Sequence, residues 1–349
     1  MNHISTVLSQ MVSVIQRHEF EKLARKHHVG GEFREFNRWS QFLAMLMGQF
    51  SCRTSLRDII YNLKARSKRL YHLGIRKTSR SHLARVNEQQ PAELYEELFG
   101  KLLGRCQAVL PGHEFSFKNK LYLLDATHIE MCLSVFPWAT FRQRKGGIKL
   151  HVGLDADGHI PAFVDMTTGN FHESKWAKTL SLPKGSFVCF DRGFTDYSWY
   201  KALTENGIFF VTRLKDNAVY ELLAKKPGRK SATIKNDQAV LLKSMEKKFR
   251  LVTHEDPKTG NVYHYLTNAH HIKAAEVADI YKERWQIELF FKWIKQNLKI
   301  KTFLGTSVNA VMTQVWIALI AYLLIAYFKF KSKLPVSLKK IVQVLQLNL

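Results

Sequence analysis

Hydrophobic patterning divides the chain into a helical first third and a later part with strand character. Apolar positions recur at helical spacing in "FNRWSQFLAMLMGQF" and "PAELYEELFGKLLGRC", which predicts helices within residues 1–115. From about residue 120 the runs become short and apolar: "LYLLDAT", "SFVCF" and "GIFFVTRL" each predict a buried strand. "IKLHVGL" and "HIPAFVDM" flank the turn sequence "DADG" and predict a hairpin.

Helical patterns alternate with these strands. Helices are expected at Ser174–Leu180 and Tyr197–Glu205, which gives the order strand, hairpin, helix, strand, helix, strand. This is the order of a ribonuclease-H-like α/β domain. Residues 215–268 interrupt it with a linker-like "KKPGRKS" and a second predicted hairpin, "FRLVTHE" and "VYHYLTN". We therefore expect a β-rich insertion within an α/β core.

One strongly apolar run follows near the C-terminus. "VWIALIAYLLIAYF" covers 14 residues, Val315 to Phe328. A membrane-spanning helix needs about 20 apolar residues, so this run predicts a buried core helix, which we expect beneath the sheet.

The charge balance predicts a polyanionic partner. The chain has 53 Lys and Arg against 29 Asp and Glu, a net charge of +24 and a pI near 9.9. Nucleic acid fits this surplus, because cationic side chains replace the counterions of phosphates. An acidic membrane surface is the rival partner, but the basic residues are spread along the whole chain without a terminal polybasic anchor. No membrane association is therefore expected.

The most basic segment, Arg53 to Arg85, contains ten Lys and Arg and one acid. Its part "GIRKTSRSHLAR" predicts a turn before a short polar helix, and this pattern is compatible with the reading helix of a helix-turn-helix unit. A solvated basic face on a helical bundle explains it equally well. Arg80 and Arg85 are the candidate DNA contacts, and residues 1–115 form the expected DNA-binding domain.

The cysteines and the N-terminus bear on the compartment. Cys52, Cys106, Cys132 and Cys189 form no CxxC pair and no metal-finger spacing, which disfavours zinc and fits a reducing cytoplasm. "MNHISTVLSQ" has no charged region followed by an apolar core, as an export signal would have. A cytoplasmic, nucleoid-associated protein is expected.

Two aspartates end predicted strands. Asp125 closes "LYLLD" and Asp191 follows "SFVCF". Ligands of open α/β sheets bind at strand carboxyl ends, so neighbouring strands would bring the two carboxylates together. Like charges at such a distance require a cation, and oxygen ligands favour Mg²⁺ or Mn²⁺. The alternative for each is an ordinary turn former or helix cap.

The segment "YKERWQIELFFKWIKQNLK", Tyr281 to Lys299, predicts an amphipathic helix. Tyr281, Arg284, Glu288 and Lys295 share one face, together with Lys292. The opposite face carries the apolar side chains Ile287, Phe290, Phe291, Ile294 and Leu298. Two interpretations stay open: Glu288 is bracketed by ordinary i,i+4 ion pairs, or it holds a metal while the neighbouring cations hold a phosphate. In the second case, two metals about 3.5–4 Å apart would cleave a phosphodiester.

These residues resemble a known family. "YKERWQIELFFKWIKQ" matches Y-(2)-R-(3)-E-(6)-K, the signature of bacterial DDE transposases of the insertion-sequence-four type, including the tryptophan after the arginine, Trp285. "LYLLDAT", "FPWATFRQRKGGIKLH", "TGNFHES" and "FVCFDRGFTD" are similar to other blocks of that family. The resemblance is strong over residues 120–215 and 270–330 and looser elsewhere.

The resemblance implies roles for individual residues. Asp125, Asp191 and Glu288 match the catalytic, metal-binding triad, which holds two Mg²⁺ ions with Mn²⁺ as a substitute. Tyr281, Arg284 and Lys295 match the residues that grip a terminal phosphate of the element's DNA. Relatives insert a β-subdomain after the second aspartate, and in some of them a tryptophan there stacks on a flipped base. This insert has no tryptophan and carries the tyrosines Tyr220, Tyr263 and Tyr265.

Other side chains are secondary candidates. A basic patch follows the first catalytic strand and consists of Arg142, Arg144, Lys145 and Lys149. We expect this patch and Lys292 of the predicted helix to contact the DNA backbone. The alternative is that these residues form an ordinary solvated surface. His172 is expected to lie near the metals or, more simply, to form hydrogen bonds only within its own loop. Trp285 is expected to pack rather than to stack on a base.

The expected architecture has four segments: a helical DNA-binding domain (1–115), the first part of a ribonuclease-H-like core (116–214), a β-rich insertion (215–268) and the second part of the core with the C-terminal helices (269–349). The expected function is cut-and-paste transposition: cleavage at the inverted-repeat ends of an insertion sequence and strand transfer into target DNA by a homodimer in a synaptic complex. The rivals are a structure-selective nuclease without strand transfer and a non-catalytic DNA-binding derivative.

Overall fold

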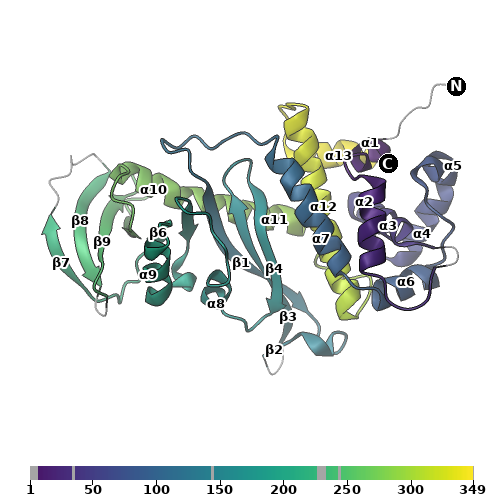
Figure 1. Cartoon of the computed structure of the whole chain (residues 1–349), viewed down its shortest axis with the longest axis horizontal. Coiled ribbons are helices and arrows are strands. Elements are labelled where there is room, and N and C mark those ends of the chain that lie inside the picture. Colours follow the sequence, from purple (N-terminus) through teal and green to yellow (C-terminus); the bar gives the residue numbers. More distant parts are fainter. Residues whose placement is uncertain (1–6, 34–35, 143–144, 226–232, 243–244, 349) are drawn as a thin grey trace. The chain divides into compact units, whose positions relative to one another are not determined.

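The computed structural model describes residues 7–33, 36–142, 145–225, 233–242 and 245–348 (Figure 1). Contacts divide the chain into two compact units. The helical unit comprises Met1–Pro111, Ile129–Gly146 and Phe291–Leu349, and the sheet unit comprises Gly112–His128 and Gly147–Phe290.

A ten-stranded mixed sheet has the order β2-β3-β1-β5-β6-β10-β9-β8-β7, and β4 pairs with β3. Its strands are β1 (Leu121–Met131), β2 (Thr140–Arg142), β3 (Lys145–Asp155), β4 (Ile160–Thr168), β5 (Phe187–Phe190), β6 (Phe209–Arg213), β7 (Tyr220–Lys225), β8 (Ile234–Leu242), β9 (Lys248–Glu255) and β10 (Val262–Thr267). The predicted strand, hairpin, helix, strand, helix, strand order is confirmed. The structure is a mixed α/β protein, as expected.

The parallel strands at the centre of the sheet position the candidate carboxylates. β1 pairs with β5 in parallel, with Leu124 opposite Phe190, and β5 pairs in parallel with β6. The strands are apolar on both faces and buried, as parallel strands covered by helices must be. The next residues, Asp125 and Asp191, therefore lie side by side where β5 ends. β1 itself continues to Met131, so the prediction that Asp125 ends its strand is wrong.

The four helices of this region follow the strands. They are α8 (Glu173–Ala177), α9 (Tyr197–Glu205), α10 (Ala274–Glu283) and α11 (Trp285–Asn297). Trp176 of α8 and Tyr200 of α9 belong to the apolar cluster around β5 and β6. α9 has the predicted bounds, and Asp196 caps it by accepting a hydrogen bond from the Trp199 N–H.

Residues 215–268 are rich in β-structure, as predicted. The hairpin of β9 and β10 has the expected location, with Val262 opposite Glu255. β10 also pairs antiparallel with β6, so β7 to β10 continue the main sheet. Of the linker-like "KKPGRKS", all but Lys225 lies outside the described residues. The boundaries between the four predicted segments stay a prediction.

The helix predicted across Tyr281–Lys299 is interrupted. α10 ends at Glu283, α11 begins at Trp285, and Arg284 stands between them. The Arg284 N–H donates to the Tyr281 carbonyl, and the Ile287 N–H donates to the Arg284 carbonyl. These bonds span three residues and tighten the chain relative to an α-helix. The apolar face is confirmed, because Ile287, Phe290, Phe291, Ile294 and Leu298 are all buried.

The helical unit contains the first seven α-helices and the two last ones. They are α1 (Val7–Val12), α2 (Arg17–Lys26), α3 (Arg38–Phe50), α4 (Leu56–Ala65), α5 (Ser67–Leu70), α6 (Arg80–Gln89), α7 (Glu93–Gln107), α12 (Val308–Lys331) and α13 (Leu338–Asn348). The described residues from 7 to 111 contain no strand, but they pack against α12 rather than forming a unit of their own.

The apolar run near the C-terminus is a buried helix, as predicted. α12 is apolar all round and packs against α3, α6 and α7. Its predicted position beneath the sheet stays a prediction. A helix without a polar face requires cover on every side, which several helices provide better than one sheet face. α12 is the one helix in the described chain whose length and composition would allow membrane crossing, and 83% of its apolar window is buried.

Candidate active site

Asp125 and Asp191 each make a local hydrogen bond at the edge of the sheet. Asp125 Oδ1 accepts from the Ala126 N–H at 2.8 Å. Asp191 Oδ1 accepts from the Gly193 N–H at 2.8 Å and caps the short 3₁₀ turn η3 (Arg192–Phe194). The capping role that was the alternative for Asp191 is therefore present, and it leaves the other carboxylate oxygen for further contacts.

Arg284 connects two of the predicted catalytic carboxylates. Its Nη1 lies 3.5 Å from Asp125 Oδ2, and its Nη2 donates to Glu288 Oε1 at 2.5 Å. The guanidinium is also 5.7 Å from the centre of the Tyr281 ring. One arginine at a helix junction thus brings together the middle of β1 and the first turn of α11.

The electrostatics show how crowded the negative charges are. The pKa of Asp125 is raised to about 7, mainly by burial and in smaller part by the nearby charges of Asp191 and Glu288. The Ala126 N–H and the Arg284 charge oppose this rise. Arg284 itself is partly desolvated, but the carboxylates around it raise its pKa above the ordinary arginine value.

The carboxylates do not form a ready metal cage in this conformation. Across the described residues, no three His, Cys, Asp or Glu side chains lie close enough together to hold an ion. Arg284 supplies the positive charge between Asp125 and Glu288 instead. Its Nε is buried without a hydrogen-bond partner in the described structure. Arg284 therefore has one buried donor atom that the described structure leaves unsatisfied, whereas buried polar atoms are usually hydrogen-bonded.

The expected basic patch has a different form. Lys149 is only 6% exposed, and its Nζ donates to the Phe171 carbonyl and to Glu173 Oε1, both at 2.9 Å. Our placement of Lys149 on a DNA-contacting surface is therefore wrong: the ammonium is enclosed and paired. Arg144 lies outside the described residues, and the same holds for the side chains of Arg142 and Lys145.

The two lysines of α11 belong to its C-terminal half, in the helical unit. Lys292 is exposed and Lys295 is half-buried. Trp285 is 57% exposed, so the expectation that it packs is wrong. As the first residue of α11 it points away from the apolar face, which leaves it free to meet a ligand.

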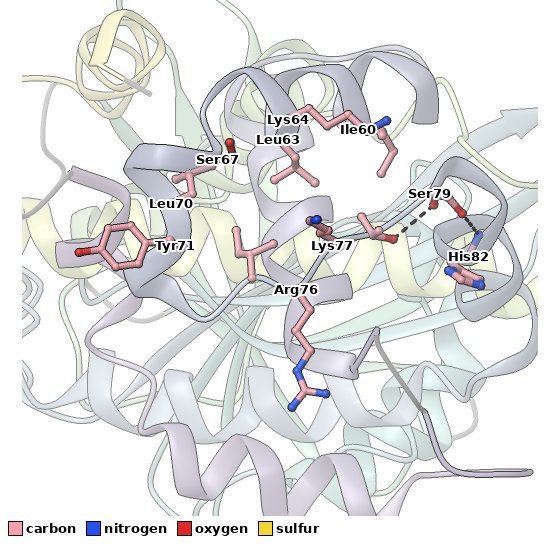
Figure 2. A pocket seen from close by; sticks show the side chains of 12 residues that line it. Ile60, Leu63, Lys64, Ser67, Leu70, Tyr71, Arg76, Lys77, Ser79 and His82 are labelled. Carbon is pink, nitrogen blue, oxygen red and sulfur yellow. Dashed lines mark hydrogen bonds between the residues drawn. The ribbon is translucent and has the colours of Figure 1, made fainter.

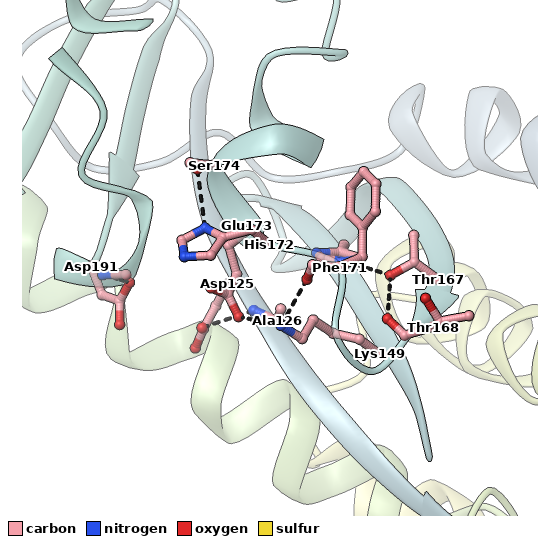
Figure 3. Close-up of polar contacts among 12 residues, drawn as sticks. Asp125, Ala126, Lys149, Thr167, Thr168, Phe171, His172, Glu173, Ser174 and Asp191 are labelled. Carbon is pink, nitrogen blue, oxygen red and sulfur yellow. Dashed lines mark hydrogen bonds and ion pairs between the residues drawn. The ribbon is translucent and has the colours of Figure 1, made fainter. Parts of the chain in front are cut away.

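The sequence did not single out Glu173. The "TGNFHES" stretch resembles a block of the family, and His172 is the candidate residue that its sequence suggests. In the structure, His172 Nδ1 hydrogen-bonds to Ser174 Oγ at 3.0 Å. Glu173 forms an ion pair with the buried Lys149. Figure 3 shows both side chains together with Asp125 and Asp191. A glutamate directly after a hairpin and before a short helix was the available signal.

Two tyrosines of the insertion form an aromatic row with Tyr281, one of the predicted phosphate-binding residues. The Tyr265 and Tyr281 rings are 4.8 Å apart between centres, and Tyr263 stacks on Tyr265 at 6.2 Å. Arg213 lies 4.9 Å over the Tyr263 ring. An aromatic row therefore runs from β10 to α10, while Tyr220 is exposed on β7.

A separate hollow of about 550 Å³ lies in the helical unit (Figure 2). Its lining combines apolar side chains such as Leu63 and Leu70 with the cations Lys64, Arg76 and Lys77. The predicted turn and polar helix border it: Gly74 adopts a φ of 72°, and Ser79 caps α6. Arg80 and Arg85 on α6 are exposed, as a DNA contact requires. Their role in DNA binding stays a prediction.

Comparison with known protein families matches two regions. Residues 116–324 match the transposase DDE domain, which includes Asp125, Asp191 and Glu288. Residues 3–76 match a domain of unknown function, DUF4372.

Individual proteins are similar over much of the chain. The putative transposase y4zB of Sinorhizobium fredii is 34% identical over 70% of this chain and 69% of its own length. A probable transposase for insertion sequence element IS5377 of Geobacillus stearothermophilus is 29% identical over 74% of this chain and 70% of its own.

A solved structure shows a related fold. The piggyBac transposase in a synaptic complex with hairpin DNA matches with a TM-score of 0.51 and 14% identity, over 97% of this chain and 77% of that one. The fold is thus that of a ribonuclease-H-like transposase. DDE transposase domains act with divalent metal ions. With the family model spanning more than half of the residues, this chain belongs to the DDE transposases, enzymes that cleave DNA and transfer the freed strand.

Proposed function

We propose that this enzyme cleaves the inverted-repeat ends of its own insertion sequence in a Mg²⁺-dependent reaction and joins the freed 3′ ends to target DNA. We further propose that it belongs to the insertion-sequence-four type. The observation that carries the proposal is the ion pairing of Arg284 with both Asp125 and Glu288, from a strand and a helix far apart in sequence.

The carboxylates are suited to hold two Mg²⁺ ions, with Mn²⁺ able to replace them. Asp125, Asp191 and Glu288 offer only oxygen ligands, which hard divalent ions prefer. The pKa of Asp125 is raised mainly by burial, with the charges of Asp191 and Glu288 adding to the rise, and a divalent ion would favour the ionised carboxylate. The ions would activate the attacking oxygen and neutralise the leaving 3′ oxygen.

Arg284 has two roles in this proposal. Without metal and DNA it is the counter-ion that keeps Asp125 and Glu288 together. Once metal supplies that charge, its planar guanidinium is free to hold a DNA phosphate through two parallel hydrogen bonds. Tyr281 and Lys295 then complete the phosphate grip. The buried Nε without a partner supports this exchange, because the metal-free arrangement leaves one donor unsatisfied.

Double-stranded DNA is the proposed partner, both as transposon end and as target. The net charge of +24 supports this, and the piggyBac relative of the fold was solved with hairpin DNA. Two ends must be held together for concerted insertion, so we propose a homodimer in the synaptic complex. The proposed site of action is the nucleoid in the cytoplasm.

The test replaces Asp191 with Asn and measures nicking of a DNA fragment that carries the element's own ends, with Mg²⁺. The expected result is loss of nicking with end binding retained, since the substitution removes one metal-binding charge and keeps the side-chain shape. Glu205→Gln is the matched control, because Glu205 is an exposed carboxylate on α9 that pairs with Lys247. Unchanged nicking by Asp191→Asn would overturn the assignment.

A second measurement separates the rivals. A pre-cut end fragment is offered together with a target plasmid, and joined products are counted. Joining that depends on the end sequence supports a transposase. Cleavage of branched DNA without joining would instead indicate a structure-selective nuclease, and binding without cleavage under any divalent ion would indicate a non-catalytic derivative.

A further inference from the structure

A buried lysine lies close to the candidate active site. Lys149 stands in the middle of β3, where its neighbours Ile148 and Leu150 are 2% and 0% exposed. The strand pairs with β4, which places Lys149 opposite Thr167. Burying an ammonium costs several kcal/mol unless hydrogen bonds and an opposite charge compensate. An apolar residue would fill this position at lower cost, so the lysine requires a separate reason.

Its partner explains the position. Lys149 Nζ reaches Glu173 Oε1 and the Phe171 carbonyl, both at 2.9 Å, and so fixes the residue that begins α8 (Figure 3). Burial works against ionisation of Glu173, but the hydrogen bond and charge of Lys149 outweigh it and hold the pKa of Glu173 below its ordinary value. Glu173 is therefore an anion whose inner oxygen cannot move freely.

Of the β3 side chains that the structure describes on this face, His151 is the other one able to carry a positive charge. His151 is fully buried against the Trp176 ring, at 5.0 Å between centres. Burial and the charge of Lys149 lower the pKa of His151 to about 4, so it is neutral near pH 7. His172 lies beside Glu173 but hydrogen-bonds to Ser174 through Nδ1.

The outer oxygen of Glu173 and the Asp191 carboxylate both lie close to Gly193. A Cβ atom built on Gly193 would lie 3.0 Å from Asp191 Oδ1 and 3.6 Å from Glu173 Oε2. Both carboxylates therefore border the same small space, and a residue without a side chain keeps it open. Asp191 is held there by the Gly193 N–H, as Glu173 is held by Lys149.

We infer that Glu173, anchored by the buried Lys149, is a fourth acidic residue of the cleavage site, which acts through Asp191 to tighten binding of the divalent ion. Glu173 is a positioning residue: its fixed negative charge adds to the field at the ion and orients the water around it. Substituting such outer partners of a metal site lowers metal affinity by about 10- to 100-fold. The inference rests on the proposed function, because it requires that Asp191 holds a divalent ion.

The test compares wild-type protein with Glu173→Gln. Mn²⁺ binding to the full chain is measured by electron paramagnetic resonance, and Mg²⁺ is titrated in the end-nicking assay. We expect Glu173→Gln to weaken Mn²⁺ binding by about 10- to 100-fold and to raise the Mg²⁺ concentration for half-maximal nicking in parallel. Nicking at saturating Mg²⁺ should recover most of the wild-type rate. A purely structural role for the Lys149–Glu173 pair would leave the ion affinity of the folded protein unchanged.

Two further variants complete the design. Glu173→Asp keeps the negative charge but shortens the side chain by one methylene, so we expect an intermediate loss of Mn²⁺ affinity. This variant also provides the test if Glu173→Gln fails to fold. Glu205→Gln is the control and should bind Mn²⁺ as the wild type does.

The outcomes separate the two proposals. Wild-type Mn²⁺ affinity in folded Glu173→Gln and Glu173→Asp, with wild-type nicking active, would overturn only this inference. A wild-type protein that neither binds Mn²⁺ nor nicks DNA would overturn the proposed function and this inference with it.

Discussion

Two arginines of the sheet unit, the buried Arg250 and the half-buried Arg284, have opposite surroundings. Arg250 on β9 donates from Nε and Nη2 to the two carboxylate oxygens of Asp237, at 2.8 and 2.7 Å, and from Nη1 to the carbonyls of Ala269 and Ile272. Arg284 divides its charge between Asp125 and Glu288 and leaves Nε without a partner.

The difference separates a structural ion pair from a functional one. Arg250 faces a single carboxylate in parallel, bidentate geometry on neighbouring strands, and nothing in its surroundings requires another ligand. Arg284 stands between carboxylates that repel one another, so its contacts can be exchanged for a metal ion and a phosphate. Buried charge alone therefore does not mark a site, whereas a buried charge with incompatible neighbours does.

The largest expected effect concerns Arg250→Met. The variant leaves Asp237, whose side chain is 9% exposed, without its counter-charge. Breaking a buried pair at one partner costs about 3–5 kcal/mol of folding free energy. Urea denaturation of the full chain should show this loss both with and without Mg²⁺. A loss below about 1 kcal/mol would mean that Asp237 is solvated and would remove one side of the comparison.

Arg284→Met should behave differently. We expect end nicking to fall by about 10²-fold, the usual cost of one missing transition-state donor. Stability should fall only in EDTA, because Asp125 and Glu288 lose their counter-ion, and Mg²⁺ should restore it. Arg284→Lys keeps the charge without the bidentate fork and should lose less activity. If Mg²⁺ fails to restore the stability of Arg284→Met, the exchange of arginine for metal is wrong.

The third prediction concerns pH. The pKa of Asp125 is raised to about 7, mainly by burial, whereas an unfolded aspartate titrates near 3.9. The folded state thus binds the proton more tightly, so this group reduces stability as pH rises from about 4 to 7, and the reduction is complete above 7. In EDTA, Asp125→Asn should be more stable than the wild type at pH 8 by on the order of 2 kcal/mol, and the gain should vanish near pH 4.

The measurement is urea denaturation of both proteins at several pH values between 4 and 8. Asp237→Asn is the contrasting variant, since removing that carboxylate leaves Arg250 unpaired and should destabilise the protein across this range. With Mg²⁺ present, the wild-type profile should flatten, because the ion favours ionised Asp125. If the unfolding free energies of the wild type and Asp125→Asn depend equally on pH in EDTA, the electrostatic account of the site is contradicted.

The main lines of the sheet could be predicted from local pattern. "LYLLD" and "SFVCF" are apolar runs closed by aspartate, and their parallel pairing brings the two aspartates to neighbouring positions. The continuation of β1 to Met131 could not be predicted from its apolar run, which ends at Leu124. The interruption at Arg284 could not be foreseen, since no Pro or Gly stands there; its side chain contacts Asp125, which lies on a distant strand. Local propensity carries no information on such a contact.

Lys149 shows the same limit for side chains. Lys149 and His151 alternate with apolar residues along β3, a pattern typical of a strand with one face in water. Here that face is covered instead, because Trp176 stacks on His151 and Glu173 pairs with Lys149. The covering residues come from α8, so burial of Lys149 depends on a later segment that the strand pattern does not contain.

The smallest expected effect concerns exposed arginines, which differ from both Arg250 and Arg284. Arg80 and Arg85 lie on α6 in the helical unit, and Arg80→Gln with Arg85→Gln should change folding stability by less than about 0.5 kcal/mol. If both contact DNA phosphates, each lost contact lowers the slope of log affinity against log salt by about 0.9, whatever the DNA sequence. Fluorescence anisotropy with an end fragment and a scrambled fragment over a salt series measures this slope. Equal losses of affinity for both fragments would indicate contacts to the DNA backbone. A loss of affinity confined to the end fragment would indicate that α6 reads bases. Unchanged affinity for both fragments would assign these arginines to a solvated surface.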